Sequence, residues 1–257
     1  MLEMKQSIWP FGRKPSKESL ERQAEFTNLV QLVHDVASND PRGLIDVVRL
    51  YMRPLQTSLL LSCALRPLHG AMAEIAPYQL FMPGVRLELT DHWRYPKLDT
   101  DTYVVDLAKD PVLPCPWHRE RYVSALATIG SGKKAGEWEQ DPNHAVAVLL
   151  LWGIACVFSG NHSIAAGILG AEGSVTPCEV WDMAGLLDKV RCDGLNFIEI
   201  ESGKVLCEMH NPHMGAVFEL GRLIRAHGIT PMQKPLYQVL QPSRIEGSKR
   251  LGSTQRA

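Results

Sequence analysis

Two apolar runs near the middle of the chain constrain its fold most. They cover residues 145–151 and 154–158, and only Trp152 and Gly153 separate them. Each run is too short to span a bilayer, so burial in a core explains them better. We interpret them as buried strands or as one strand pair with a tight turn, although a helix over 145–151 fits the pattern nearly as well.

The motif that follows the second run carries the chemistry of the sequence. Ser159-Gly160-Asn161-His162-Ser163 leads into residues 164–169, whose small side chains let a helix pack closely on a sheet. A strand, a polar turn and a helix in this order present free backbone N–H groups and the positive end of a helix dipole to an anion. Gly160 permits close approach of a phosphate. Ser163 is suited to cap the helix or to bind a phosphate oxygen, and His162 is suited to carry a charge or transfer a proton. On local chemistry alone, ordinary capping by Asn161 or Ser163 explains the motif better.

The rest of the chain indicates an α/β fold with attached helices. We predict a flexible N-terminus over residues 1–18 and a helical N-terminal region over 19–83. An α/β core with C-terminal helices is expected over 84–240, followed by a disordered tail over 241–257. Within the core, strands are expected at 85–89, 102–107 and 197–200, helices at 118–129, 164–169 and 214–226, and a further element at 180–190.

Composition excludes several classes of protein. The 27 Lys and Arg residues nearly balance the 28 Asp and Glu residues, so no global positive field drives nucleic-acid binding. The six cysteines form no Cys-x-x-Cys pair, which argues against a zinc knuckle and a disulfide framework. Without a secretory leader or a membrane span, we expect a cytoplasmic protein with no membrane insertion. Cys156 lies inside an apolar run and is interpreted as a buried structural residue rather than a redox thiol.

A family resemblance adds to this interpretation. The order of motifs over about residues 100–170 resembles the ParB/sulfiredoxin-like superfamily, in which a polar turn before an Ala-Ala helix binds nucleotide phosphates. The motifs that carry it are Tyr103–Leu107, Asp110–Pro114, His118–Arg121, Ile154–Phe158 and Gly160–Gly167. Within the superfamily, the Gly-Asn-His-Ser form looks most like plasmid fertility-inhibition proteins of the Osa and FiwA type. The resemblance implies a ParB/sulfiredoxin-like mixed sheet core with additional N- and C-terminal helices.

The resemblance also implies roles for particular residues. Residues that contact the triphosphate of ATP would be Gly160, Asn161, His162, Ser163 and Arg121, and the catalytic candidates are His162, Glu139 and Arg119. A magnesium ion is expected to accompany the ATP, with Glu139 as base or as holder of a metal-bound water. A solvated helix face explains either arginine equally well, and a lone glutamate such as Glu139 is usually a surface residue. Asn161 and Ser163 replace the Glu and Arg of partition-type ParB, which argues against a CTP-gated clamp.

The preferred hypothesis is a plasmid-encoded fertility-inhibition protein that hydrolyses ATP and cleaves DNA. It would block transfer of plasmid DNA or T-DNA through a type IV secretion system, with coupling components of that system as further partners. The alternative is a non-catalytic nucleotide- or protein-binding module that acts on the same machinery by occupancy. A partition or regulatory protein is the third choice, and the sequence offers no helix-turn-helix reader to support it. His210 and His213 are three residues apart, but Pro212 favours a loop at a helix start over a metal site.

Overall fold

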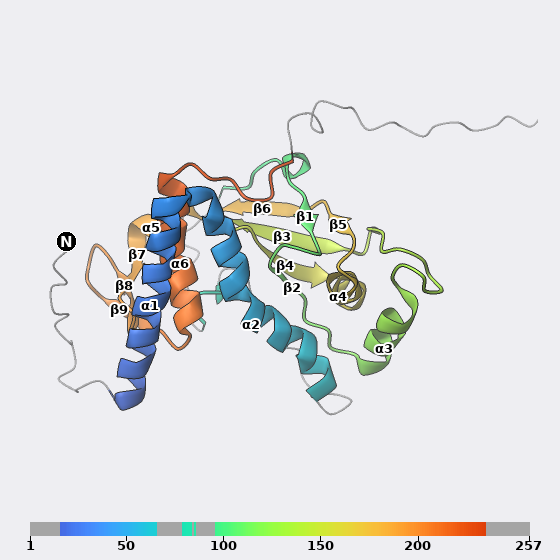
Figure 1. Ribbon diagram of the computed structural model, residues 1–257, viewed down its shortest axis with the longest axis horizontal. Helices are drawn as coiled ribbons and strands as arrows, with labels where there is room; N and C mark the ends of the chain where they lie inside the picture. Colours follow the sequence, from blue (N-terminus) through green and yellow to red (C-terminus); the bar gives the residue numbers. More distant parts are fainter. Residues whose placement is uncertain (1–15, 66–78, 84, 86–95, 235–257) are drawn as a thin grey trace, which may run out of the picture.

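The computed structural model describes residues 16–65, 79–83, 85 and 96–234 (Figure 1). Helices and small sheets together form a mixed α/β fold, as predicted. The predicted flexible N-terminus lies almost entirely outside the described residues, and the predicted disordered tail lies wholly outside them. The strand expected at 85–89 also lies outside them, apart from its first residue.

Two long helices joined by a short 3-10 turn begin the described chain, as the helical pattern predicts. Ser16 starts the first helix by accepting a hydrogen bond from the N–H of Ser19 at 3.1 Å. Asp40 caps the turn by accepting from the N–H of Arg42 at 2.9 Å. The elements are α1 (Lys17–Asn39), η1 (Pro41–Gly43) and α2 (Leu44–Leu65).

A four-stranded sheet lies at the centre. Its strands, in spatial order, are β2 (Val112–Leu113), β4 (Ile154–Ser159), β3 (Ala145–Leu150) and β6 (Glu179–Asp182). β3 and β4 are antiparallel with Leu149 opposite Ile154, whereas β2 runs parallel to β4 and β6 parallel to β3. The strand-pair interpretation of the two apolar runs is therefore confirmed. The helix alternative over 145–151 is wrong, because β3 has a hydrogen-bonded strand on each side.

Two smaller antiparallel sheets flank the central one. They contain β1 (Val105–Asp106) with β5 (Ser174–Val175), and β7 (Val190–Cys192), β8 (Asn196–Glu199) and β9 (Val205–Glu208). The strand predicted at 197–200 is confirmed as β8. The strand predicted at 102–107 is shorter than expected, because Asp99 accepts a hydrogen bond from the N–H of Asp101 and turns the chain into η4 (Thr100–Thr102).

Three of the remaining helices agree with predicted ones: α3 (Arg119–Thr128), α4 (Asn161–Gly170) and α6 (Pro212–Ala226). The helix α5 (Ala184–Lys189) was not specified as a helix in advance. The single element expected at 180–190 is in fact a strand followed by a helix, β6 and α5. Among the described helices, none combines the length and the apolar content that crossing a membrane requires.

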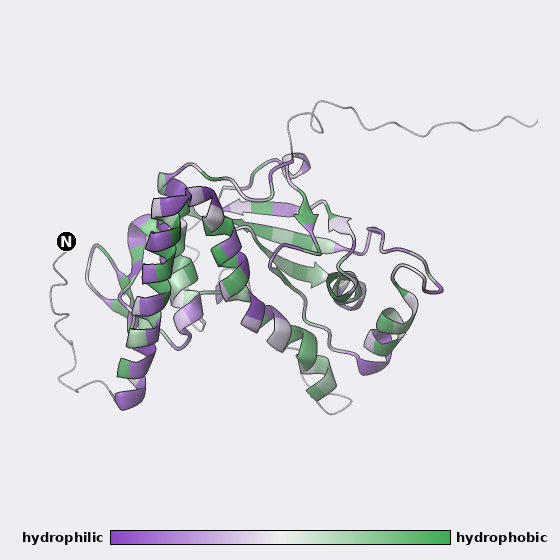
Figure 2. Ribbon diagram, viewed as in Figure 1, coloured by the Kyte–Doolittle hydropathy of each residue, from purple (hydrophilic) through white to green (hydrophobic). Residues whose placement is uncertain are grey.

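Both faces of the central sheet are buried. Leu149 and Ile154 belong to a core shared with α1, α2 and α6, whereas their neighbours Val148 and Ala155 belong to a second core shared with β1, β5 and α4. Figure 2 shows the resulting apolar character of β3 and β4 beside a largely hydrophilic α1. Burial on both faces explains why these strands are continuously apolar rather than alternating.

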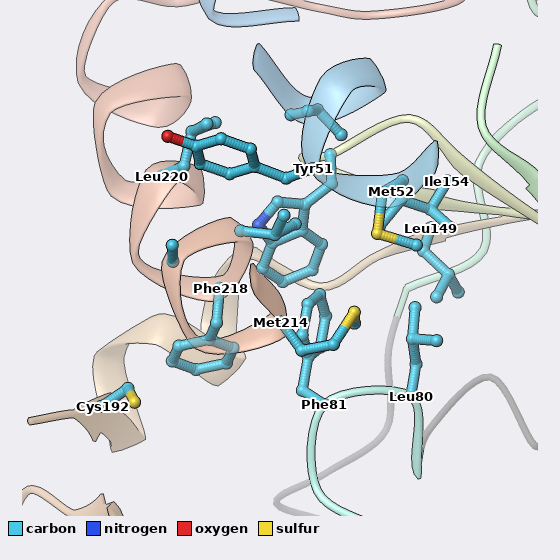
Figure 3. Close-up of a cluster of buried hydrophobic side chains, with 14 of the residues drawn as sticks. Tyr51, Met52, Leu80, Phe81, Leu149, Ile154, Cys192, Met214, Phe218 and Leu220 are labelled. Atoms are coloured by element: carbon cyan, nitrogen blue, oxygen red, sulfur yellow. The ribbon is translucent and has the colours of Figure 1, made fainter. Parts of the chain in front are cut away.

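Aromatic rings fill the centre of the larger core (Figure 3). Phe218 of α6 is fully buried, and its ring centroid lies 5.3 Å from that of Phe81, 5.3 Å from that of Phe197 and 6.0 Å from that of Trp152. The ring of Phe81 in turn lies 4.5 Å from the indole of Trp152. These contacts join α6 to the sheet and to the segment around residue 81.

Buried polar contacts attach α2 to the edge of the central sheet. Gln56 is 2% exposed, and its Nε2 donates to the carbonyl oxygen of Val112 at 2.9 Å. About two turns earlier on the helix, Arg49 donates to the buried carboxylate of Asp110 at 2.9 Å. α2 thus holds β2 in place, and β2 leads directly into the segment before α3.

Candidate functional site

A pocket of about 500 Å³ lies between α3 and the junction of β4 with α4. The predicted residues Gly160, Asn161, His162 and Ser163 all line it, and so does Arg121. Because β2 and β4 are parallel, their carboxyl ends meet at the same edge of the sheet. This edge faces α3 and α4 (Figure 1), and ligands of α/β proteins commonly bind at such an edge.

Gly160 makes the turn from β4 into α4. Its φ of 79° lies in the left-handed region, and a Cβ at this position would come within 2.3 Å of Cδ2 of His144. The helix begins at Asn161 rather than at Ile164 as expected, so the three polar residues after Gly160 form its first turn. No side chain caps the helix, so the prediction of a capping Asn161 or Ser163 is wrong.

Asn161 is buried at the base of the pocket with 8% exposure. Its Oδ1 accepts a hydrogen bond from the N–H of Cys115 at 2.6 Å, which sets the orientation of the amide. Its Nδ2 has no acceptor among the described residues. Asn161 therefore joins α4 to the segment after β2 and keeps an amide donor at the pocket.

His162 connects the first turn of α4 to the start of α3. The backbone N–H of His118 donates to Nε2 of His162 at 3.1 Å, so Nδ1 carries the ring proton. Its ring centroid lies 5.8 Å from that of Trp117 and 6.4 Å from that of Tyr122. Burial lowers the pKa of His162, and the charges of Arg121 and His118 lower it further. The ring is thus a neutral hydrogen-bond acceptor for the backbone at α3.

Ser163 and His144 form a close pair that resembles a catalytic dyad. Oγ of Ser163 lies 2.5 Å from Nε2 of His144 and donates to the carbonyl oxygen of Gly160 at 3.1 Å. However, Nδ1 of His144 accepts from the N–H of Asp141 at 2.8 Å, so the proton of the neutral ring sits on Nε2. The histidine therefore donates to the serine. A general base has to accept the serine proton, so this arrangement holds Ser163 in place and does not activate it.

The pocket has a positive character. The N–H groups of residues 161–163 have no acceptor among the described residues, and the first helical bond runs from Ile164 to the carbonyl of Gly160 at 2.9 Å. Arg121 lies with its guanidinium carbon 5.6 Å from the ring centroid of Trp117. No Asp or Glu of the described chain lines this pocket. The helix dipole, the free N–H groups and Arg121 together favour an anion.

The other two predicted residues lie outside this pocket. Arg119 is the first residue of α3 and is exposed, and it does not line the pocket. Glu139 is exposed on the segment between α3 and β3, where it lines a neighbouring pocket of about 310 Å³ together with Glu137 and Asp141. The structure thus gathers the predicted phosphate-contacting residues in one pocket. Arg119 does not line it, and Glu139 lines the neighbouring pocket, which Ser163 also lines.

Comparison with protein families gives a match over most of the chain. A model described as a family of unknown function, DUF6710, matches residues 12–230. The chain belongs to this family. Comparisons with curated proteins and with solved structures give no match.

The stretch that matches the DUF6710 model contains every element from α1 to α6, and so the whole of the pocket. The residues that sequence reasoning missed include Trp117 and Phe158, which line this pocket, and His144, which lines the neighbouring one. Trp117 follows a proline-rich segment that leads to a predicted site residue, and this position in the sequence could have indicated a place in the pocket. His144 and Phe158 have no local signal, because only the pairing of β3 with β4 brings them to the turn at Gly160.

No group of three or more His, Cys, Asp or Glu side chains within the described residues is arranged to hold a metal ion. His210 and His213 flank the start of α6, where Asn211 caps the helix by accepting from the N–H of His213 at 3.0 Å. The interpretation of this segment as a loop at a helix start is confirmed. Cys156 is buried, as predicted, and burial raises its pKa to about 12.

His144 and His162 predict a loss of stability in mild acid. Both must be neutral to accept their backbone hydrogen bonds, and burial lowers the pKa of His144 as well as that of His162. Below about pH 6.5 the unfolded chain binds protons that the folded chain does not. The free energy of unfolding is therefore fully retained above this pH. As the pH falls it decreases, by at most about 1.4 kcal/mol per unit for each histidine.

Urea unfolding at pH 7.5 and pH 5.5 measures this effect. The variant His144→Gln should lose part of the dependence on pH, whereas His210→Gln, at an exposed position, should retain it. An unfolding free energy that is equal at both pH values in the wild type would contradict the assignment of the two neutral rings.

Proposed function

We propose that the pocket at the start of α4 binds the phosphate groups of a nucleotide, with ATP as the first ligand to test. One observation carries this proposal: helix N-terminal N–H groups and an arginine, none of them paired with an acceptor among the described residues, face the same pocket. A phosphate there meets several donors and the positive end of the helix dipole.

Each donor has a defined task in this proposal. The N–H groups of residues 161–163 and the Nδ2 group of Asn161 bind phosphate oxygens from the helix side. Arg121 neutralises negative charge from the α3 side. His162 contributes by keeping α3 against α4 through its bond with His118. The positive charge in the site therefore comes from Arg121 and the helix, and not from histidine.

The wider proposal extends the resemblance to Osa- and FiwA-type proteins. It assigns a ParB/sulfiredoxin-like core and a fertility-inhibition protein that hydrolyses ATP, cleaves DNA and blocks DNA transfer through a type IV secretion system. Its support is the set of motifs around Tyr103–Leu107 and Gly160–Gly167. Plasmid DNA or T-DNA, the coupling components of the secretion system and a cytoplasmic location belong to the same proposal.

A specific observation favours the non-catalytic alternative. Ser163 and the Nε2 atom of His162 are both occupied by structural hydrogen bonds, and Glu139 lies in the neighbouring pocket. Hydrolysis also needs a group that accepts a proton from the attacking water at the bound phosphate. A module that binds a nucleotide and acts by occupancy needs only the donors described above.

Two arginines on the same helix test the phosphate site. Arg121→Gln should weaken ATP binding about tenfold, because it removes a charge-assisted hydrogen bond. Arg119→Gln is the matched control, since Arg119 is equally exposed on α3 but does not line the pocket. Calorimetric titration of both variants and the wild type measures the difference. Equal affinities for all three proteins would refute a phosphate site at this pocket.

Phosphate release separates the two functional candidates. The wild type is incubated with ATP and magnesium, with and without DNA, beside His162→Ala, Glu139→Gln and Arg121→Gln. Turnover by the wild type that Arg121→Gln abolishes supports the enzyme. ATP binding without any turnover supports the binding module.

A further inference from the structure

Two exposed aromatic rings belong to the proposed phosphate pocket. Trp117, just before α3, is 43% exposed, and Phe158, next to the end of β4, is 47% exposed. Both line the pocket, Trp117 from the segment before α3 and Phe158 from β4. Large apolar side chains in a polar, positively charged pocket are suited to a ligand that carries a flat ring.

The two rings differ in the contacts that they already make with other side chains. The ring of Trp117 has the guanidinium of Arg121 over it and the ring of His118 at 5.5 Å. Phe158 makes no ring contact with any described aromatic residue. Trp117 therefore orients Arg121, whereas Phe158 has a ring face available for a ligand.

The position of Phe158 on β4 explains why its side chain is exposed. Side chains alternate along β4, so Phe158 lies on the same face as Ile154 and Cys156. Those two residues are buried in the core shared with α1, α2 and α6. Phe158 comes two residues later, at the end of the strand, where this cover stops and the pocket begins.

We propose that Phe158 is the residue that selects a nucleotide over other phosphate compounds, by stacking on its base. This inference rests on the proposed phosphate site, because the donors at α4 hold one end of the ligand and Phe158 the other. The pocket volume of about 500 Å³ lies in the range of small-molecule sites. Stacking on a ring tolerates any base, so this residue distinguishes nucleotides from ringless phosphates rather than one base from another.

A pair of ligands with the same phosphate chain tests the inference. ATP and inorganic tripolyphosphate are titrated calorimetrically into the full chain in the presence of EDTA. The wild type should bind ATP about tenfold more tightly than tripolyphosphate. Phe158→Ala should remove this preference and leave the affinity for tripolyphosphate unchanged. Phe158→Tyr keeps a ring and should retain the preference.

A further variant and three other outcomes complete the test. Val123→Ala, at a 58% exposed apolar position of α3 outside the pocket, should change neither affinity. Equal binding of both ligands by the wild type overturns the role of Phe158 but leaves the phosphate site standing. A Phe158→Ala variant that loses both ligands equally also overturns it, since the residue would then be structural. Binding of neither ligand by the wild type overturns the phosphate site and this inference together.

Discussion

Replacing Gly160 with alanine is expected to lower the free energy of unfolding by about 3 kcal/mol. The left-handed φ of 79° accounts for about 1 kcal/mol of this loss, because a Cβ disfavours that conformation. The larger part comes from the contact of the new Cβ with His144, at 2.3 Å from Cδ2 and 3.2 Å from Cα. The imidazole has little freedom to move away, because hydrogen bonds to Asp141 and Ser163 engage both ring nitrogens.

Gly132→Ala is the matched control for this prediction. Gly132 also has a left-handed φ, 76°, but a Cβ there would meet nothing within 4 Å. This variant should lose only the backbone part, about 1 kcal/mol. Urea unfolding of the two variants measures the difference, which isolates the contact with His144. If Gly160→Ala and Gly132→Ala lose the same free energy of unfolding, the close approach of Gly160 to His144 is refuted.

Replacing Phe218 with alanine is expected to destabilise the protein by about 4 kcal/mol. The side chain is fully buried, and its ring lies close to those of Phe81, Trp152 and Phe197. Removing it leaves a cavity between α6 and the sheet that rigid aromatic neighbours cannot fill. The loss is measured by chemical unfolding.

Phe158→Ala provides the same chemical change at a 47% exposed position. It should cost about 1 kcal/mol or less, because nearly half of the surface of this residue already contacts water. A Phe218→Ala variant as stable as Phe158→Ala would contradict the aromatic centre of the core. The comparison also establishes that Phe158→Ala is folded when it is used in the binding experiments.

The elements of the fold follow largely from local patterns. Helices appear where the apolar spacing predicts them, as in α3 and α6, and the two runs at 145–151 and 154–158 are strands. The choice between strand and helix for the first run was open in the sequence. It was decided by the strands on both sides of β3, since a buried apolar run lacks the periodicity that distinguishes the two.

The sequence by itself indicated the position of the candidate site, through Gly160 and the polar residues that follow a buried strand. Only the tertiary structure decided what those residues do. Oδ1 of Asn161 and Nε2 of His162 accept backbone hydrogen bonds from Cys115 and His118, residues more than 40 positions earlier in the chain. A short motif specifies which donors and acceptors are present. The partners of those groups come from chain segments that meet only when the sheet and helices assemble, so their roles depend on the fold as a whole.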